Sequence, residues 1–579
     1  MKARKIFVIT ISLVSSILSV GCSSHQTKKT HEKPVKKEVV MRIRDKIKTL
    51  DTAMSLDSNS LVTNQNVFEG LYRYDKEGHL VLAGAKSEKT EDEGRVHVYR
   101  LRKDAKWSNG DPVVAQDYVY AWKKLFSPEN DTSNWTNLLI LKNAEEIHDG
   151  QKDMESLGVQ ALDDHTLRVE LIGNIPYYKE IFASTAMFPQ NHVVAEKYGD
   201  DYGKTSESTV FNGPFMVKGL ERGSHKWELI KNKNYWGKKD VKVKKFKYVV
   251  EKNKEKAQKN FFKEKYDYAR VGCFYDKKLA SKRGFHHRRI PEISIICFNQ
   301  KRQVTGNVHF RRAVTYAIDR RKIAATKGFH GQALYGIVPA DYSYSPENDV
   351  DYRKEAGKIV DLNKTKAKSE WEQAKKEIGK NQVEMTLTLN DNRDCLKIAK
   401  IIRNNLEKTL PGLHIRLKSV AVNDKLTQAI DYDYDMCYRT WQPRYVDPMA
   451  FAINGGIEHL KDDYDNPNYW NNLEKAMVTN TNEFSKRRQY LIAAEKDLIE
   501  KDAFVAPLCQ QENGYLLNPK LKDVVFAPYG SNYILRNCRL KNSPLFQLLD
   551  EARKFFSFLN ADMTRDDERE RVYILRFSN

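Results

Sequence analysis

Residues 101–113 read LRKDAKWSNGDPV, and this stretch decides how the rest of the chain is interpreted. Its segment Asn109-Gly110-Asp111-Pro112 predicts a turn. Beyond the turn, apolar residues recur at helical spacing and predict one apolar helix face, made of Val114, Tyr118, Ala121, Trp122 and Leu125. The stretch therefore leads through a turn into an amphipathic helix.

Strands and helices alternate along the rest of the chain. Leu167, Val169 and Leu171 alternate with charged residues, which predicts a half-buried strand. Residues 391–410 predict a helix, and residues 414–420 predict the strand that follows it. Such alternation is typical of α/β lobes.

Residues 310–318 predict a further helix with one apolar face. Arginine is rarely buried without partners, because removing its charge from water is costly. We therefore expect the arginines around this helix to lie largely on the solvent side: Arg311, Arg312, Arg320 and Arg321.

Length and charge restrict the class of protein. The chain has 579 residues, enough for about three to four domains. Its formal charge of +21 favours contact with polyanions such as anionic lipid heads or acidic wall polymers. The charge is spread along the sequence without an arginine-rich arm or zinc-finger spacing, so we expect no nucleic acid partner.

The amino terminus predicts export. A cationic start precedes the uncharged, mainly apolar run 6–20, which is short for a membrane-spanning helix but suits a secretory signal. Residues 1–22 are predicted to be this signal, and the polar, cationic residues 23–40 a flexible tether. No second long apolar segment follows, so we expect the body of the protein outside the membrane.

The end of the signal, Leu18-Ser19-Val20-Gly21-Cys22, resembles the lipobox of bacterial lipoproteins. Ser19 stands where the lipobox usually has leucine. The resemblance implies that Cys22 is acylated and becomes the new amino terminus, and a diacyl anchor holds a protein stably on a bilayer. We expect a lipid-anchored protein on the extracellular face of a bacterial cell membrane, in a Gram-positive organism. The alternative is an ordinary signal that contains a cysteine.

Catalytic and metal-binding motifs such as GxSxG, HExxH and the Walker loop are missing from the sequence. Apart from Cys22, six scattered cysteines form no CxxC pair; we expect most to be buried apolar residues, with one disulfide possible. His286-His287-Arg288-Arg289 is predicted to be a surface loop, because adjacent histidines point in different directions on a helix or a strand. We expect no enzyme, no metal site and no cofactor.

Further short motifs lie on both sides of residues 101–113 and extend over most of the chain. They are Phe68-Glu69-Gly70-Leu71, Leu162-Asp163-Asp164-His165-Thr166, Asn212-Gly213-Pro214-Phe215, Asn234-Tyr235-Trp236, Phe298-Asn299-Gln300, the run from Arg312 to Arg320, and Tyr445-Val446-Asp447-Pro448. Their order and spacing, from about residue 41 to residue 541, resemble the extracytoplasmic oligopeptide-binding proteins of peptide ABC importers, which form solute-binding protein family 5.

The resemblance implies an α/β fold of the two-lobed periplasmic-binding-protein type II class, with an extra α/β domain and a hinge between the lobes. Lobe I would be assembled from three stretches, 41–70, 205–298 and 513–542. The extra domain would span 71–204, and lobe II would span 299–512. Two crossovers would act as the hinge, and the lobes would close over the ligand.

The resemblance also implies that an oligopeptide lies between the lobes. Strand-like pairing would hold its main chain, while roomy pockets would tolerate varied side chains. Trp441 falls on the family's cleft tryptophan, and the alternative is a core aromatic residue. The other ligand-binding residues implied are Ser58, Asn59, Trp135, Asn212, Tyr438, Thr440, Gln442, Arg444 and Asp447.

Arg444 departs from the family pattern. The family has Trp-x-x-Asp-Tyr here, and its Asp neutralises the α-amino group of the peptide, whereas this chain reads Trp441-Gln442-Pro443-Arg444-Tyr445. A cation that faces an ammonium group is repelled. Three explanations stay open: the amine binds elsewhere, near Asp447 or Asp433; the ligand is anionic or amine-blocked; or Arg444 points to solvent.

The tail, residues 543–579, extends beyond the family pattern. Ser543-Pro544 is typical of a helix start, and an apolar helical stripe follows it, made of Leu545, Leu548, Leu549, Ala552, Phe556 and Leu559. The tail is interpreted as a helix packed on the body or as a docking element for a partner.

We therefore expect a monomeric, lipid-anchored extracellular receptor. It would bind oligopeptides and deliver them to the permease subunits of an ABC importer, for nutrition or for peptide signalling. A receptor for another solute, such as a metal chelate, haem or an oligosaccharide, is an alternative on the same fold. A surface adhesion protein is a second alternative, because the charge of +21 favours binding to polyanions.

Overall fold

The computed structural model describes residues 38–130, 132, 135–136, 138–421, 433–453, 463–478, 483–529 and 533–541. The predicted signal with Cys22, nearly all of the tether and the tail 543–579 lie outside the described residues. Within the described ranges, the structure has no helix that is long and apolar enough to cross a membrane.

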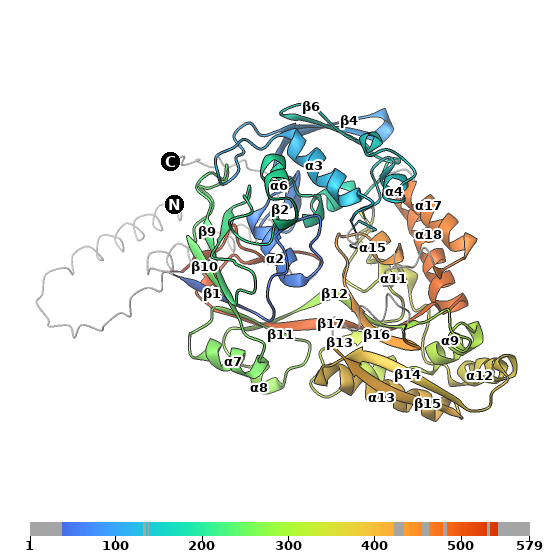
Figure 1. Cartoon of the computed structure of the whole chain (residues 1–579). Helices are drawn as coiled ribbons and strands as arrows, with labels where there is room; N and C mark the ends of the chain where they lie inside the picture. Colours follow the sequence, from blue (N-terminus) through green and yellow to red (C-terminus); the bar gives the residue numbers. More distant parts are fainter. Residues whose placement is uncertain are drawn as a thin grey trace, which may run out of the picture. The chain divides into compact units, whose positions relative to one another are not determined.

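Eleven strands form one sheet (Figure 1). Ten of them follow one another across it, and the eleventh pairs with β17 from outside this path. In spatial order they are β15 (Leu413–Val420), β14 (Val383–Asn390), β16 (Met436–Trp441), β12 (Phe285–Phe298), β17 (Val505–Leu517), β11 (Tyr268–Gly272), β1 (Val39–Ile43), β10 (Lys245–Val250), β9 (Lys226–Lys231) and β8 (Phe215–Lys218), with β13 (Gly331–Ala333) as the eleventh.

The two central strands, β12 and β17, join the two halves of this sheet. They have 14 and 13 residues and pair antiparallel along most of that length, with two shifts of register. On one side β12 pairs with β16, and on the other side β17 pairs with β11. We call β12 and β17 the crossing strands, because they lie close to the lobe boundaries at residues 298 and 512 that the resemblance implies.

The predicted surface loop at residues 286–289 is wrong, because these residues lie in β12 and pair with β17. His286 and His287 remain exposed although their backbone belongs to the sheet. Exposure was therefore predicted correctly, but the secondary structure was not.

Residues 101–113 connect a small sheet to an amphipathic helix, α3 (Ala115–Phe126), which Figure 1 shows beside that sheet. The sheet has the order β4 (Ala85–Glu91), β5 (Val96–Leu101), β7 (Thr166–Glu170) and β6 (Val159–Asp163). After β5 the chain turns, with the N–H of Trp107 donating to the carbonyl of Asp111 at 2.8 Å, and enters α3. The indole of Trp107 donates to Asp117 in the first turn of α3 at 2.8 Å. The turn and the apolar helix face predicted here are confirmed.

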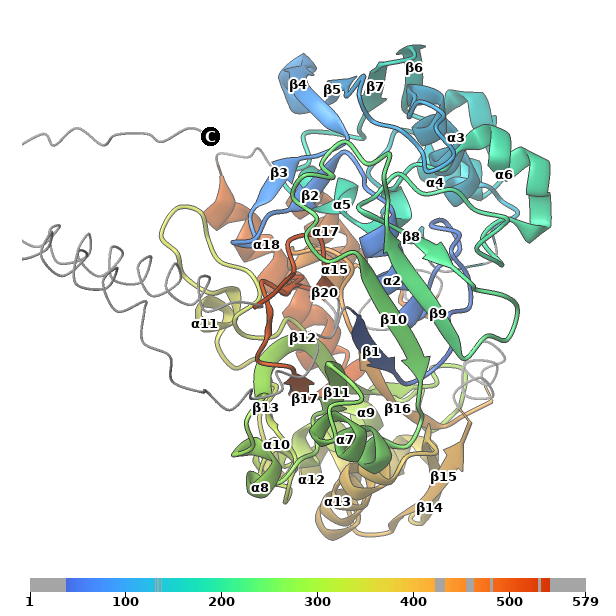
Figure 2. The same cartoon turned by 90° about the vertical axis from the view of Figure 1, so that its left-hand side faces the viewer.

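The other helices and strands predicted within the described residues are also confirmed. The strand predicted around Val169 is β7, and the helix predicted in 391–410 is α13 (Arg393–Thr409), which leads into β15. The helix predicted at 310–318 is α9 (Val308–Ala317), which packs against α12 (Lys364–Ile378) (Figure 2).

The remaining helices and short strands complete the described chain. The helices are α2 (Ser58–Val67), α4 (Ala144–His148), α5 (Tyr178–Phe182), α6 (His192–Tyr198), α7 (Lys254–Phe262), α8 (Lys277–Ala280), α10 (Arg320–Ala324), α11 (Tyr352–Ala356), α15 (Met449–Ala452), α17 (Pro467–Val478) and α18 (Phe484–Lys496). The strand pairs are β2 (Tyr72–Tyr74) with β3 (Leu80–Leu82), β18 (Leu521–Lys522) with β21 (Arg539–Leu540), and β19 (Val525–Phe526) with β20 (Tyr533–Ile534).

Two of the four arginines expected on the solvent side are buried. Arg320 is 1% exposed, and its guanidinium donates to the carbonyls of Pro507, Thr315 and Ile318. Arg311 is buried in the same manner, against carbonyls that include that of Asp502. The prediction was wrong for both because these guanidinium groups satisfy backbone carbonyls near the ends of helices.

Candidate functional site

Most of the implied ligand-binding residues lie at the end of β16 and just beyond it. In this strand the side chains of Tyr438 and Thr440 share one face, and those of Arg439 and Trp441 share the other. Tyr438 is buried in the core and donates to the hydroxyl of Ser294 at 3.0 Å. Thr440 is exposed. Tyr438 is therefore a core residue in this structure.

Trp441 has features of both a core aromatic residue and an accessible cleft residue. Its ring meets that of Phe451 edge to face, with 4.8 Å between the centroids, and packs against the larger core cluster. The residue is nevertheless only half-buried, so part of it is accessible. Next to it, Gln442 has a buried side-chain oxygen that accepts no hydrogen bond from the described residues.

Arg444 lies against a segment that is nearly 400 residues away in the sequence. Its Nη1 is 3.5 Å from the carbonyl oxygen of Ser55, just before α2. Burial lowers the pKa of Arg444 to about 10, and the nearby Tyr529 opposes this shift. Arg444 is half-buried between these segments, so part of the residue remains accessible.

A carboxyl group that the sequence did not reveal, Glu180 of α5, lies close to the same place. It accepts hydrogen bonds from the Tyr74 hydroxyl and from the backbone N–H of Val446. Burial raises the pKa of Glu180 to about 7, and the charge of Asp447 adds to this shift. Both Glu180 and Arg444 act on the pKa of Tyr529, so the three side chains are neighbours. No motif in the sequence marks Glu180, because its partners come from distant segments.

Asp447 is already paired. Arg487 binds it through two hydrogen bonds of 2.7 and 3.0 Å, and both side chains are buried. The same guanidinium lies 5.0 Å from the ring centre of Tyr177, which stacks on Tyr445 at 5.6 Å. Asp447 therefore anchors the segment after β16. Asp433, the other carboxylate considered for a ligand amine, is exposed and lies 3.6 Å from Arg302.

Ser58 and Asn59 begin α2, and the side chain of Asp57 caps this helix. Asp57 accepts from the backbone N–H groups of Asn59 and Ser60 at 3.1 and 3.0 Å. The side-chain amide of Asn59 donates to the carbonyl of Asp45 at 2.8 Å. Ser58 and Asn59 are half-buried and follow Ser55, whose carbonyl oxygen lies 3.5 Å from Arg444, by three and four residues.

Trp135 and Asn212 are not brought to this site by any contact described. The ring of Trp135 lies on that of His148, with 3.6 Å between the centroids. The amide of Asn212 accepts from the N–H of Glu69 at 3.0 Å and donates to its carbonyl at 2.8 Å. Asn212 thereby holds two backbone segments together, and its polar atoms are used in doing so.

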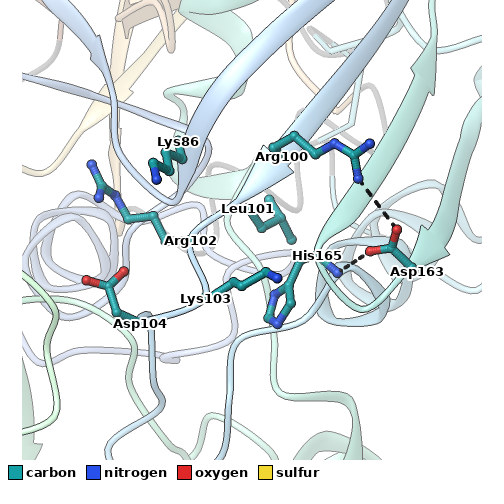
Figure 3. Close-up of a pocket in the computed structure, with 8 residues that line it drawn as sticks. All are labelled: Lys86, Arg100, Leu101, Arg102, Lys103, Asp104, Asp163 and His165. Carbon is teal, nitrogen blue, oxygen red and sulfur yellow. Dashed lines mark hydrogen bonds and ion pairs between the residues drawn. The ribbon is translucent and has the colours of Figure 1, made fainter.

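A surface hollow of about 590 Å³ lies elsewhere, on the small sheet (Figure 3). Lys86, Arg100, Leu101, Arg102, Lys103, Asp104, Asp163 and His165 line it. Arg100 is 3.6 Å from Asp163, which also accepts from the backbone N–H of His165 at 2.8 Å. The hollow includes part of the 101–113 stretch but none of the implied ligand-binding residues. Within the described chain, no three His, Cys, Asp or Glu side chains are grouped so that they could hold a metal ion.

Comparisons with known proteins agree with this architecture. A family model described as bacterial extracellular solute-binding proteins, family 5 middle, matches residues 79–456. The dipeptide-binding protein of Lactococcus lactis is 28% identical over 558 residues, which cover 93% of this chain and 100% of that protein. Two similar solved structures are Listeria monocytogenes OppA bound to peptide, 30% identical with a TM-score of 0.78, and the pheromone receptor PrgZ, 29% identical with a TM-score of 0.79. Each of them covers 88% of this chain and is itself covered completely.

Proposed function

The chain belongs to the bacterial extracellular solute-binding proteins of family 5, and we propose that it captures oligopeptides between its lobes and delivers them to an ABC importer. Proteins of this family are receptors and not enzymes. OppA of Listeria monocytogenes was solved with a bound peptide, which supports peptides as the ligand class. PrgZ is a pheromone receptor, and this supports peptide signals, besides nutrients, as ligands.

Several further parts of the proposal come from the sequence. Cys22 would carry the lipid that holds the receptor on the extracellular face of a Gram-positive cell membrane. The receptor would act as a monomer and meet the permease subunits of the importer. The lobes would be built from the segments given above, with the crossing strands β12 and β17 as the hinge.

One observation supports the ligand site above all others. Segments that are far apart in the sequence converge at the end of β16: Ser55 before α2, Glu180 in α5, Arg444 after β16, and Tyr529 near the carboxyl end. Of these residues Glu180 and Arg444 are half-buried, whereas Ser55 and Tyr529 are buried, and we propose that the closing cleft lies beside the two half-buried side chains. A peptide main chain can bind there because it offers one donor and one acceptor at each residue.

Arg444 would determine which ligand groups can bind at one end of the proposed site. Arg444 is half-buried, and Asp447 is already balanced by Arg487, so neither of these two positions offers a free carboxylate in place of the amine-binding Asp of the family. We infer that an anionic or amine-blocked ligand group lies next to Arg444. A free ammonium group at this position would be repelled, most strongly where the site excludes water.

Two measurements test the proposal. Mass spectrometry of ligands that co-purify with the full protein should find oligopeptides, and a haem, metal chelate or oligosaccharide in their place would contradict the peptide assignment. Affinity should then be measured for one peptide with a free and an acetylated amino terminus, in wild type, Arg444→Asp and the neutral control Arg444→Met.

Wild type should bind the acetylated peptide at least about tenfold more tightly than the free one, and Arg444→Asp should reverse this order. Arg444→Met should bind both peptides with similar affinity. If all three proteins bind the two peptides equally, Arg444 has no part in recognition, although the receptor function would stand.

A further inference from the structure

Positive charge is concentrated in one stretch of the chain, which corrects the expectation that it is spread along the sequence. Residues 226–289 contain 22 Lys and Arg against 7 Asp and Glu, whereas the whole chain contains 98 against 77. About a ninth of the residues therefore carries 15 of the 21 excess positive charges. The place of this stretch in the fold decides which partner the charge can meet.

The strands of this stretch share one end of the large sheet with β1 and β17. The parallel strands β1 and β10 begin within one residue of each other, and β11 begins beside Met41 of β1 (Figure 2). Leu517, the last residue of β17, lies opposite Tyr268, the first residue of β11. Phe285, the first residue of β12, lies opposite Leu516. Four strands therefore begin, and one ends, at the same end of the sheet.

The segments that adjoin these strand ends carry exposed cations. α7 connects the parallel strands β10 and β11, so it runs back against them, and its carboxyl end lies where the strands begin. Cations also stand just before β10, just before β12 and just after β17. We call the exposed members of this set the basic end: Lys242, Lys244, Lys263, Lys265, Lys282, Arg283 and Lys520.

Carboxylates near these segments do not cancel the charge of the basic end. Asp240, before β10, pairs with Arg536 at 2.8 Å. Asp523, after β17, pairs with Arg539 at 2.5 Å. Glu264 is exposed between two of the lysines and offsets one charge. The seven cations thus leave a surface with a net positive charge of several units.

The chain enters the body at the basic end. β1 starts at Val39, directly after the predicted tether, and Glu38 pairs with Lys245 of β10 at 2.5 Å. The 15 residues 23–37 separate Cys22 from Glu38, and a chain of this length spans at most about 55 Å even when fully extended. An anchor at Cys22 would therefore hold the basic end near the bilayer.

We propose that the basic end lies on the anionic lipid headgroups of the membrane that carries the anchor. The proposal rests on the lipid anchor proposed above for its orientation. A bilayer with anionic lipids has a negative surface potential, and each Lys or Arg held near it strengthens binding about fivefold. This attraction falls off within about 8 Å at physiological salt, so it acts on the side of the receptor that faces the bilayer. The contact would fix which side of the receptor is turned to the membrane of the importer.

The first test measures the body without its anchor. The complete mature chain with Cys22→Ser cannot be acylated, and its sedimentation with vesicles gives the affinity of the protein surface alone. It should bind vesicles of phosphatidylcholine that contain phosphatidylglycerol, should not bind phosphatidylcholine alone, and should be released by high salt. Equal binding to both kinds of vesicle, or binding to neither, would overturn the proposal.

A triple variant locates the contact. Lys263→Gln, Lys265→Gln and Lys282→Gln together, in the Cys22→Ser chain, should weaken binding to the anionic vesicles at least about tenfold. The matched control removes the same charge from exposed lysines on α12 and just beyond it, in the other half of the sheet (Figure 1), and should bind like the parent chain. Its substitutions are Lys368→Gln, Lys376→Gln and Lys380→Gln. Equal losses in the two triple variants would mean that the total charge, and not the basic end, causes binding.

A third measurement distinguishes the membrane from an acidic wall polymer. If the Cys22→Ser chain binds soluble polyglycerol phosphate but not the anionic vesicles, the partner is a polymer and the membrane proposal is wrong. Peptide affinity in solution is measured for the same proteins and should stay within about twofold of the parent chain, because the substituted lysines are exposed and outside the proposed peptide site. A chain that binds peptide but no anionic vesicle would overturn this proposal and leave the receptor function intact.

Discussion

Buried guanidinium groups in this chain are accommodated in more than one way. Arg320 donates to three backbone carbonyls, and Arg487 forms a double hydrogen bond with Asp447. Arg444 is half-buried where distant segments meet, and its Nη1 lies 3.5 Å from the carbonyl oxygen of Ser55. Burial lowers the pKa of both Arg320 and Arg444 to about 10. The first two groups stabilise the fold, and the third is the one we assign to recognition.

Arg320→Met should destabilise the fold strongly. The substitution leaves buried carbonyls of Pro507, Thr315 and Ile318 without a donor, which should lower the free energy of unfolding by about 3 kcal/mol. Arg321→Met is the matched control, because Arg321 is exposed and pairs with Asp361 at 3.0 Å on the surface. This control should change the free energy by less than about 1 kcal/mol. Urea unfolding measures both, and equal losses would contradict the structural role of Arg320.

Glu180 should make stability depend on pH. Burial raises its pKa in the folded protein to about 7, above the ordinary value of 4.5. The folded state therefore binds the proton more tightly, and the stability gained below pH 4.5 is lost as pH rises towards 7. Tyr74 and Tyr529 stay neutral in this window, because burial raises the pKa of each.

Glu180→Gln tests this dependence, because glutamine keeps an acceptor for Tyr74 but does not titrate. At pH 5 the variant and wild type should be about equally stable, and at pH 8 the variant should be more stable by about 2 kcal/mol, a value that allows for partial access to solvent. Thermal unfolding between pH 4.5 and pH 8 gives the comparison. Parallel curves for the two proteins would mean that Glu180 is ionised throughout.

At the scale of single elements, the sequence predicted helices and strands whose apolar residues lie on one face. It did not predict a strand that is buried on both faces. α3 and α13 each bury one face, and β7 has its apolar residues on one face only, so the apolar residues of each element recur with one clear period. β12 has exposed histidines at its start and buried residues on both faces at its end, so no single period describes it. That is why residues 286–289 were interpreted as a loop although they begin a crossing strand.

The cap of α2 should contribute to stability and to the shape of the site. Asp57→Ala removes the acceptor of the N–H groups of Asn59 and Ser60, which should cost about 1 kcal/mol of unfolding free energy. Asp57→Asn retains an acceptor oxygen and should cost less than half as much. Chemical denaturation compares the two variants with wild type, and an equal loss in both would mean that charge, not capping, matters here.

At the scale of the whole molecule, composition and local pattern were insufficient to find the site. Arg444 and Ser55 are separated by 389 residues, and Glu180 comes from a third segment. Their proximity depends on how the crossing strands bring the halves of the sheet together. The resemblance to a family supplied the segment after Trp441, but it could not supply Glu180 or the pairing of Asp447 with Arg487.

Closure of the lobes should depend on contacts outside the peptide site. Tyr177, in the predicted extra domain, stacks on Tyr445 of the predicted lobe II, and Arg487 lies over Tyr177. If the two rings belong to parts that separate on opening, their contact stabilises the closed state alone. Tyr177→Ala should therefore weaken peptide binding about 3- to 10-fold, mainly through faster dissociation.

Tyr177→Phe is the control for this prediction, because phenylalanine keeps the ring that stacks on Tyr445. It should bind peptide within about twofold of wild type, since the stacking contact is retained. Stopped-flow dissociation gives the rate, and small-angle scattering with and without peptide reports closure independently. A Tyr177→Ala protein that is less stable but binds with unchanged affinity would place both rings in one rigid body, and the hinge would then lie elsewhere than between these residues.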